Sequence, residues 1–184
     1  MKRRDVVLTA GAVGAAAMLQ GQTPAAPPKT HLKVGDTAPD FKVPTTTASK
    51  SFQLSDYKGK SGVVVAFFPA AFTGGCTKEM TAYGNEIKKF QDMGFEVIGI
   101  STDNTPSLAY WAEHMLKVNA PLGSDFATRK TAEAYGVLMK DRGIANRATF
   151  VIDKEGKIVH IEEGSAAVDI SGAANACARV KGKS

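Results

Sequence analysis

The sequence predicts a single α/β domain, on three observations. A continuous apolar run at residues 63–68 precedes a helical apolar pattern over 76–91, and the same order of strand and helix returns from residue 95. Two apolar segments around a short turn follow, and a helical pattern ends the chain. Strands alternating with helices are typical of α/β folds. With 43% hydrophobic and 22% charged residues, the 184-residue chain has the composition of an ordinary soluble domain.

The first predicted unit joins a buried strand to a long helix. Residues 63–68 are all apolar, which is typical of a strand covered on both faces. Apolar residues then recur at helical spacing over 76–91, and Gly94 is placed to end the helix. The recurring residues are Cys76, Met80, Tyr83, Ile87 and Phe90. Cys76 is therefore expected where the strand turns into the helix.

A second unit repeats this order. Residues 95–100 predict a strand, with Thr105 as the N-cap and Pro106 as the first residue of the next helix. The apolar stripe expected on that helix consists of Leu108, Trp111, Ala112 and Met115.

The last third predicts a short helix, a hairpin and a closing helix. Asp125 can cap a helix that ends at Gly136. Residues 149–153 and 157–161 flank a turn that contains Gly156, which predicts a β-hairpin. The closing helix is expected over about 171–180.

The N-terminus predicts an export signal rather than part of the fold. Basic residues 2–4 precede an apolar stretch at 6–19 and a polar, Pro-rich segment at 21–28. The arginine pair resembles a twin-arginine leader, a bacterial export address. We therefore expect a signal and linker over 1–28, a domain over 29–184, and export to the periplasm. The apolar stretch is shorter than the roughly 20 residues of a stable membrane span. A cytoplasmic or membrane-tethered protein is the alternative.

Several function classes are excluded by what the chain contains. The formal net charge of +5 includes the basic N-terminus, and the other basic residues are scattered without interleaved aromatic residues, so no nucleic-acid partner is expected. Two cysteines cannot staple a disulfide scaffold, and His31, His114 and His160 have no second ligand at a metal-binding spacing. A P-loop and a Gly-rich dinucleotide turn are absent. The chemistry is therefore expected at a cysteine.

The segment around Cys76 combines features that activate a thiol. If Thr73 caps the helix, Cys76 lies in the first turn, where free backbone N–H groups and the helix dipole favour an anion. The thiolate is the nucleophilic form of cysteine. Gly74 and Gly75 let backbone donors approach a small substrate. The alternative is a buried cysteine acting as a small apolar residue, and position alone leaves both interpretations open.

The same residues resemble a known family. Pro69, Thr73 and Cys76 match the active-site pattern of the peroxiredoxins, in the alkyl hydroperoxide reductase and thiol-specific antioxidant group: Pro, three residues, Thr, two residues, Cys. The resemblance extends over residues 31–180 and also rests on the segments 34–41, 77–79 and 147–153.

This resemblance implies a thioredoxin-like fold, with a central mixed sheet flanked by helices. It also implies a thiol peroxidase of antioxidant defence that reduces hydrogen peroxide and organic hydroperoxides through a sulfenic acid on Cys76. Arg147, rather than Arg142, matches the family position of a fixed positive charge beside that cysteine. The peroxide would be held by Arg147, the Thr73 hydroxyl and the N–H groups of Gly75 and Cys76, while Pro69 limits solvent access. No metal, haem, flavin or nicotinamide cofactor is implied.

Cys177 is the residue that decides whether the chain itself can supply the thiol that regenerates Cys76. Position 81 is Thr, where some similar peroxiredoxins carry a resolving cysteine, so Cys177 is the one internal candidate. Because Ala173, Ala176 and Val180 lie at helical spacing around it, we expect Cys177 to pack on an apolar face. Regeneration would then use an external thiol, either a thioredoxin-like protein or a low-molecular-weight thiol. Attack by Cys177 after local opening is the alternative.

Other expectations concern the oligomeric state and two alternative classes of thioredoxin-like protein. A homodimer is expected from the resemblance. A thioredoxin-type oxidoreductase normally has two cysteines separated by two residues, but positions 73 and 79 are Thr and Glu. A non-catalytic thioredoxin-like binding domain is the second rival, and rapid sulfenylation of Cys76 by peroxide would exclude it.

Overall fold

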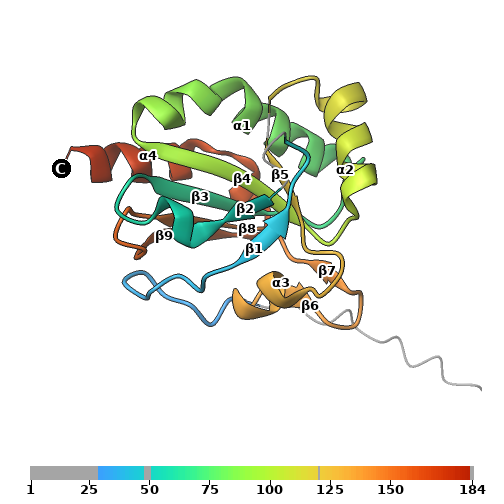
Figure 1. The fold of residues 1–184 in the computed structure, drawn as a ribbon, viewed down its shortest axis with the longest axis horizontal. Coiled ribbons are helices and arrows are strands. Elements are labelled where there is room, and N and C mark those ends of the chain that lie inside the picture. The colour runs from blue at the N-terminus through green and yellow to red at the C-terminus, as the bar shows by residue number, and fades with distance from the viewer. Residues whose placement is uncertain (1–28, 48–50, 120, 183–184) are drawn as a thin grey trace, which may run out of the picture.

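A mixed five-stranded sheet forms the centre of the computed structural model, which describes residues 29–47, 51–119 and 121–182. The strand order is β5-β4-β3-β8-β9, with β3 in the middle (Figure 1). Strand β3 pairs in parallel with β4 and antiparallel with β8. The predicted α/β domain with a mixed sheet is confirmed. The five strands are β3 (Gly62–Phe67), β4 (Phe95–Ser101), β5 (Leu122–Ser124), β8 (Ala148–Ile152) and β9 (Ile158–Glu163).

Two hydrophobic layers enclose this sheet. Helices α1 (Gly74–Asp92) and α4 (Ser171–Lys181) lie on one face, and α4 contacts β8 and β9 (Figure 1). The other face is covered by smaller elements. Because side chains alternate along a strand, Val63 and Val65 of β3 belong to one core while Val64 and Ala66 belong to the other. This double burial explains the continuous apolar run in the sequence.

The smaller elements were not predicted from the sequence. They are too short to show a clear period, and all four strands among them have only two or three residues. On the second face these elements are β1 (Lys42–Pro44), β2 (Ser51–Gln53), η1 (Leu54–Tyr57), β6 (Leu138–Met139) and β7 (Ile144–Ala145). The 3-10 helix η3 (Gly164–Val168), also not predicted, contacts α1 instead.

Helix α2 (Thr105–Trp111) differs from its prediction at both ends. Its N-cap is Asn104, whose side chain accepts a hydrogen bond from Ser107 N at 2.9 Å, and not Thr105. The helix continues into a π-helical turn, η2 (Ala112–Leu116). A π turn adds one residue to the repeat. Leu116 is therefore buried in place of the predicted Met115, which is 48% exposed.

Helix α3 (Lys130–Ala134) is shorter than predicted. Asp125 does not cap it from the expected position, because residues 126–128 form a turn first. The Asp125 carboxylate instead accepts a hydrogen bond from Ala132 N at 2.8 Å, inside the helix. Gly136, with φ +68°, follows the helix as predicted.

Two predicted glycine positions are confirmed. Gly94, just beyond the end of α1, has φ +83°, and Gly156 in the β8–β9 turn has φ +84°. Both conformations lie in the left-handed region that favours glycine. The first stops α1 and the second closes the hairpin.

The predicted signal and linker, residues 1–28, lie outside the described residues, so the boundary at residue 29 stays a prediction. Within the part of the chain that is described, no helix has the length and apolar character needed to cross a membrane.

Candidate active site

Cys76 is the third residue of α1, the element that follows strand β3 along the chain. The first backbone hydrogen bond of the helix runs from Thr77 N to Thr73 O at 2.9 Å. The N–H groups of Gly74, Gly75 and Cys76 therefore precede the intrahelical ladder and can donate to a ligand. The Cys76 side chain is only 1% exposed, although residues 72–75 above it are all exposed. The sulfur thus lies just beneath an accessible helix N-terminus.

Thr73 occupies the predicted N-cap position, but its side chain does not cap the helix. Its Oγ1 donates to Ala70 O at 3.0 Å. Because the hydroxyl proton is used in this bond, the Oγ1 lone pairs can accept a hydrogen bond from a bound molecule. Thr73 is consequently oriented as an acceptor beside Cys76.

Arg147 lies against Cys76, with its Nη2 donating to Sγ at 3.1 Å. The contact follows from the sheet, because Ala148 of β8 pairs with Phe67 at the end of β3, and Cys76 follows that end. The Arg147 side chain is only 12% exposed. Arg142, the competing candidate, is exposed. A guanidinium is always charged and can stabilise a thiolate at any working pH.

Glu79 is a site residue that the sequence analysis did not identify. Its carboxylate forms an ion pair with Arg147 Nη1, and its side chain is fully buried. The guanidinium therefore bridges Glu79 and Cys76, which fixes its orientation. A signal was available: Glu79 lies one turn after Cys76 and next to Met80, on the apolar stripe of the helix. A carboxylate at a core position needs a cationic partner.

The segment that leads into α1 is held by hydrogen bonds near the end of β4. Asp103 accepts hydrogen bonds from Ala71 N at 2.8 Å and from Ser101 Oγ at 2.9 Å. Pro69, which precedes this segment, is half-buried. Gly75 lets the guanidinium pack closely, since a Cβ there would lie 3.3 Å from Arg147 Nη2 and would crowd it. The structure thus brings together Cys76, Thr73, Gly75 and Arg147.

Cys177 is not part of this group. It is fully buried on α4, with Ala173 and Ala176 on the same face, as expected for a packed residue. Burial raises the pKa of the Cys177 thiol to about 12. The pKa of Tyr83, seven residues beyond Cys76 on α1, is raised by burial first and then by the charges of Glu162 and Cys177.

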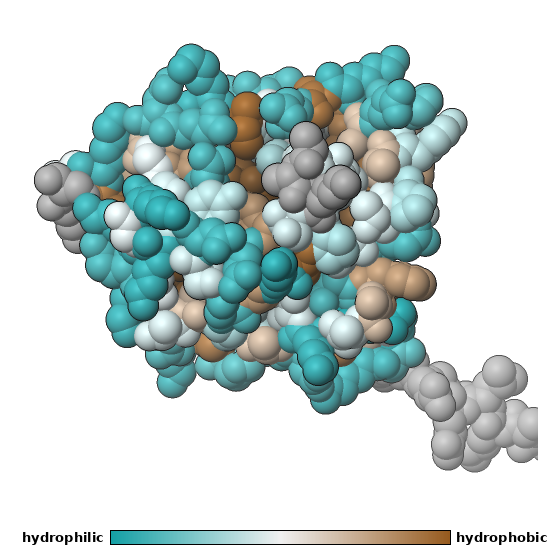
Figure 2. Space-filling view, viewed as in Figure 1, coloured by the Kyte–Doolittle hydropathy of each residue, from teal (hydrophilic) through white to brown (hydrophobic). Residues whose placement is uncertain are grey.

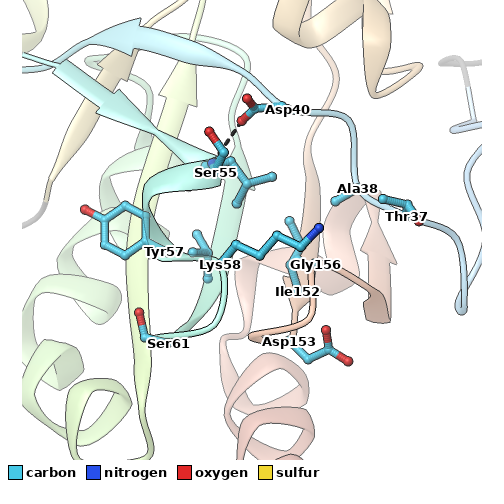
Figure 3. A pocket seen from close by; sticks show the side chains of 12 residues that line it. Thr37, Ala38, Asp40, Ser55, Tyr57, Lys58, Ser61, Ile152, Asp153 and Gly156 are labelled. Carbon is cyan, nitrogen blue, oxygen red and sulfur yellow. Dashed lines mark hydrogen bonds between the residues drawn. The ribbon is translucent and has the colours of Figure 1, made fainter.

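A separate hollow of about 160 Å³ lies at the opposite end of β3 (Figure 3). Its floor is apolar, and Lys58 extends across it towards Gly156. Ser61 and Val63 place it at the start of β3, whereas Cys76 follows the end of that strand. Among the described residues, no group of three or more His, Cys, Asp or Glu side chains could hold a metal ion.

Known proteins are similar to this chain in sequence and in fold. Residues 34–161 match the AhpC/TSA family. The chain is 40% identical to peroxiredoxin-2 of Macaca fascicularis over 139 residues, which cover 71% of this chain and 69% of the relative. It is 38% identical to the chloroplastic 2-Cys peroxiredoxin BAS1 of Spinacia oleracea, covering 69% of this chain and 51% of that protein. The chain thus spans only about half the length of the chloroplast relative.

A solved structure extends the similarity to the whole fold. Peroxidoxin BcpB from Mycobacterium tuberculosis superimposes with a TM-score of 0.73 at 34% identity, covering 83% of this chain and 98% of that chain. The family match covers well over half of the chain, and the fold and the cysteine motif agree with it. This chain therefore belongs to the AhpC/TSA family and is a peroxiredoxin, a thiol-dependent peroxidase of thioredoxin-like fold.

Proposed function

We propose that Cys76 is the peroxidatic cysteine of this enzyme, which reduces hydrogen peroxide and organic hydroperoxides. The observation that carries the proposal is the 3.1 Å contact between Arg147 Nη2 and Cys76 Sγ at the N-terminus of α1. A helix N-terminus and a guanidinium both stabilise a thiolate. Cys177, the other described cysteine, lies in the second half of α4 and not at the N-terminus of a helix.

The proposed substrate position follows from the free donors and acceptors. The peroxide accepts hydrogen bonds from Arg147 and from the N–H groups of Gly75 and Cys76, and donates its O–H to Thr73 Oγ1. The Cys76 thiolate attacks the terminal oxygen, so an S–O bond forms while the O–O bond breaks. The departing alkoxide or hydroxide takes a proton and leaves as alcohol or water. Preorganised donors stabilise the charge that develops on this oxygen.

Regeneration is proposed to use an external thiol. That thiol attacks the Cys76 sulfenic acid, releasing water and forming a mixed disulfide, which a second thiol reduces. The position of Cys177 supports this route. Cys177 is fully buried on α4, where burial raises the pKa of its thiol to about 12, so little of the nucleophilic thiolate is present at neutral pH.

The test compares two single-cysteine variants. Cys76→Ser is expected to abolish hydroperoxide consumption, while the matched Cys177→Ser variant retains turnover with dithiothreitol. One equivalent of peroxide without reductant should convert Cys76 to a sulfenic acid, which dimedone traps as a thioether with loss of water, and intact mass should show one dimedone adduct per chain. Persistent activity of metal-free Cys76→Ser would contradict the mechanism. A dominant disulfide between Cys76 and Cys177, with turnover lost in Cys177→Ser, would contradict the external thiol.

Assembly and location complete the proposal. We propose a homodimer, which sedimentation velocity would detect as a single species of twice the chain mass. We also propose export to the bacterial periplasm through the signal at residues 1–28. Deleting residues 2–20 should then keep the protein in the cytoplasm, and an unchanged location after cell fractionation would refute export.

A further inference from the structure

An exposed aromatic surface borders the candidate active site. We define it as the aromatic rim: Phe72, Tyr110 and His114. Phe72 is 48% and Tyr110 is 58% exposed. Their ring centroids lie 6.5 Å apart, and Tyr110 stacks on His114 at 4.1 Å. Beneath them, the buried Trp111 lies 6.2 Å from Phe72. The three rings therefore form one continuous aromatic surface, with the buried Trp111 beneath Phe72.

Such exposure is uncommon on this protein. In the view of Figure 2, hydrophilic side chains cover most of the surface, and hydrophobic ones show as separate brown and tan areas. Among the described residues, only five large hydrophobic side chains are markedly exposed, and Phe72 and Tyr110 are two of them. Exposed aromatic residues that adjoin one another are typical of protein interaction sites.

The backbone of Phe72 provides a second observation. Its φ is +65°, a conformation that is rare for a bulky residue and that glycine or asparagine adopts at lower cost. The strained backbone holds an exposed ring, so the packing of the domain does not explain the choice of side chain. Strain of this kind is concentrated at functional sites.

The position of the rim relative to Cys76 identifies its occupant. Phe72 opens the exposed segment 72–75, which lies directly above the buried sulfur. A protein that delivers a thiol to Cys76 must cover this segment and its neighbours, because Cys76 is only 1% exposed. A small thiol can enter without contacting the rim. Cys177 is buried on another helix and does not supply a nearby thiol.

We propose that the aromatic rim is the docking surface for a protein dithiol reductant with an apolar surface around its reactive cysteine. This inference rests on the proposed regeneration by an external thiol. Phe72 and Tyr110 are the expected hot spots, since aromatic side chains over a rigid base carry much of the binding energy at interfaces. The rim acts on the reductive step and takes no part in the attack on peroxide.

The test separates the two half-reactions. Phe72→Asn removes the ring and suits the left-handed backbone, and Tyr110→Ser removes the second ring. Val34→Ser is the matched control, because Val34 is 63% exposed and lies in the N-terminal segment next to Gly35, which bonds to Ile158 at the start of β9. Stopped-flow fluorescence measures Cys76 oxidation by hydrogen peroxide, and then reduction of the oxidised protein by purified thioredoxin or by dithiothreitol.

We expect Phe72→Asn and Tyr110→Ser to lower the rate constant for reduction by thioredoxin about tenfold or more. Oxidation by peroxide and reduction by dithiothreitol should stay within about twofold, as should every rate of Val34→Ser. An unchanged thioredoxin rate overturns the inference. An equal loss of rate with thioredoxin and with dithiothreitol, or a slower oxidation by peroxide, also overturns it. A shift of the variants to monomers in sedimentation overturns it too, because the rim would then belong to the contact with a second copy of the chain. If wild-type protein consumes no peroxide with either reductant, the proposed function itself fails.

Discussion

The two cysteines have similar burial but different electrostatic surroundings. Cys76 is in the first turn of α1, 3.1 Å from a guanidinium that a buried carboxylate holds in place. Cys177 is in the second half of α4, among alanines and aromatic side chains of an apolar layer. Both side chains are at most 1% exposed.

This comparison separates burial from reactivity. A thiol in an apolar layer stays protonated, and burial accordingly raises the pKa of Cys177 to about 12. Around Cys76 the same degree of burial is combined with free N–H groups and Arg147, which provide the positive potential that a thiolate needs. The reactive cysteine is therefore recognised by the charges around it and not by its solvent exposure.

The largest effect is expected from removing the positive charge. Arg147→Ala should lower the rate constant for Cys76 oxidation by about 10²–10³, the usual loss for one donor that stabilises developing charge. Arg147→Lys should recover only part of the rate, because a lysine cannot bridge Cys76 and Glu79 with a planar fork. Stopped-flow oxidation by hydrogen peroxide measures both variants. Arg142→Ala, at an exposed arginine, is the control and should match wild type. Equal oxidation rates in wild type and the three variants would contradict the electrostatic difference between the two cysteines.

A smaller effect is expected from changing the carboxylate that holds Arg147. Glu79→Gln keeps the shape of the side chain and an acceptor for the guanidinium, but it removes the charge. We expect the oxidation rate to fall about tenfold and the unfolding temperature to drop, because a buried ion pair loses one charged partner. Glu86→Gln changes a partly exposed glutamate on the same helix, which pairs with Lys89 at the surface, and should alter the two quantities little. A lower unfolding temperature with an unchanged rate would show that Glu79 acts on the fold alone.

The smallest effect on turnover is expected at Cys177. Cys177→Ala should keep the peroxidase rate with dithiothreitol within about twofold and destabilise the fold by about 1 kcal/mol. It should also change the alkaline stability profile. The folded pKa is raised from the ordinary value of 9.0 to about 12, so the stabilisation is complete below pH 9 and is lost as the pH rises towards 12.

Urea unfolding at a series of pH values measures this difference. The free energy of unfolding of wild type should fall more steeply between pH 9 and 12 than that of Cys177→Ala. Tyr135, whose pKa is also raised by burial, is present in both proteins and cancels in the comparison. The pKa of Tyr83 is raised by Cys177 as well as by burial, so any change in its contribution belongs to the Cys177 effect. Parallel curves would contradict a buried, protonated Cys177.

The sequence predicted the elements that have a strong period. Strand β3 and helix α1 were located within a residue or two, because both carry long apolar patterns and α1 ends at a glycine. The active-site motif predicted Cys76 and Thr73, and a family position predicted Arg147. The structure places these residues together.

Other features depend on contacts between distant parts of the chain. Glu79 could not be paired with Arg147 by spacing, since 68 residues separate them. The π turn after α2 shifted the buried position from Met115 to Leu116, and local periodicity does not reveal such an insertion. The Thr73 hydroxyl bonds back to Ala70, an alternative to capping that the residue type equally allows.

The order of strands has a consequence for how activity is acquired during folding. Cys76 and Arg147 are separated by 71 residues and meet only when β8 pairs with β3, whereas the β3–α1–β4 unit is local in sequence. Non-local strand pairing carries the larger loop-closure entropy and slows folding. A partly folded chain can thus contain the helix that bears Cys76 without the guanidinium beside it. Assembly of the thiolate site is tied to the joining of the two halves of the domain, so peroxide reactivity arises with the complete sheet.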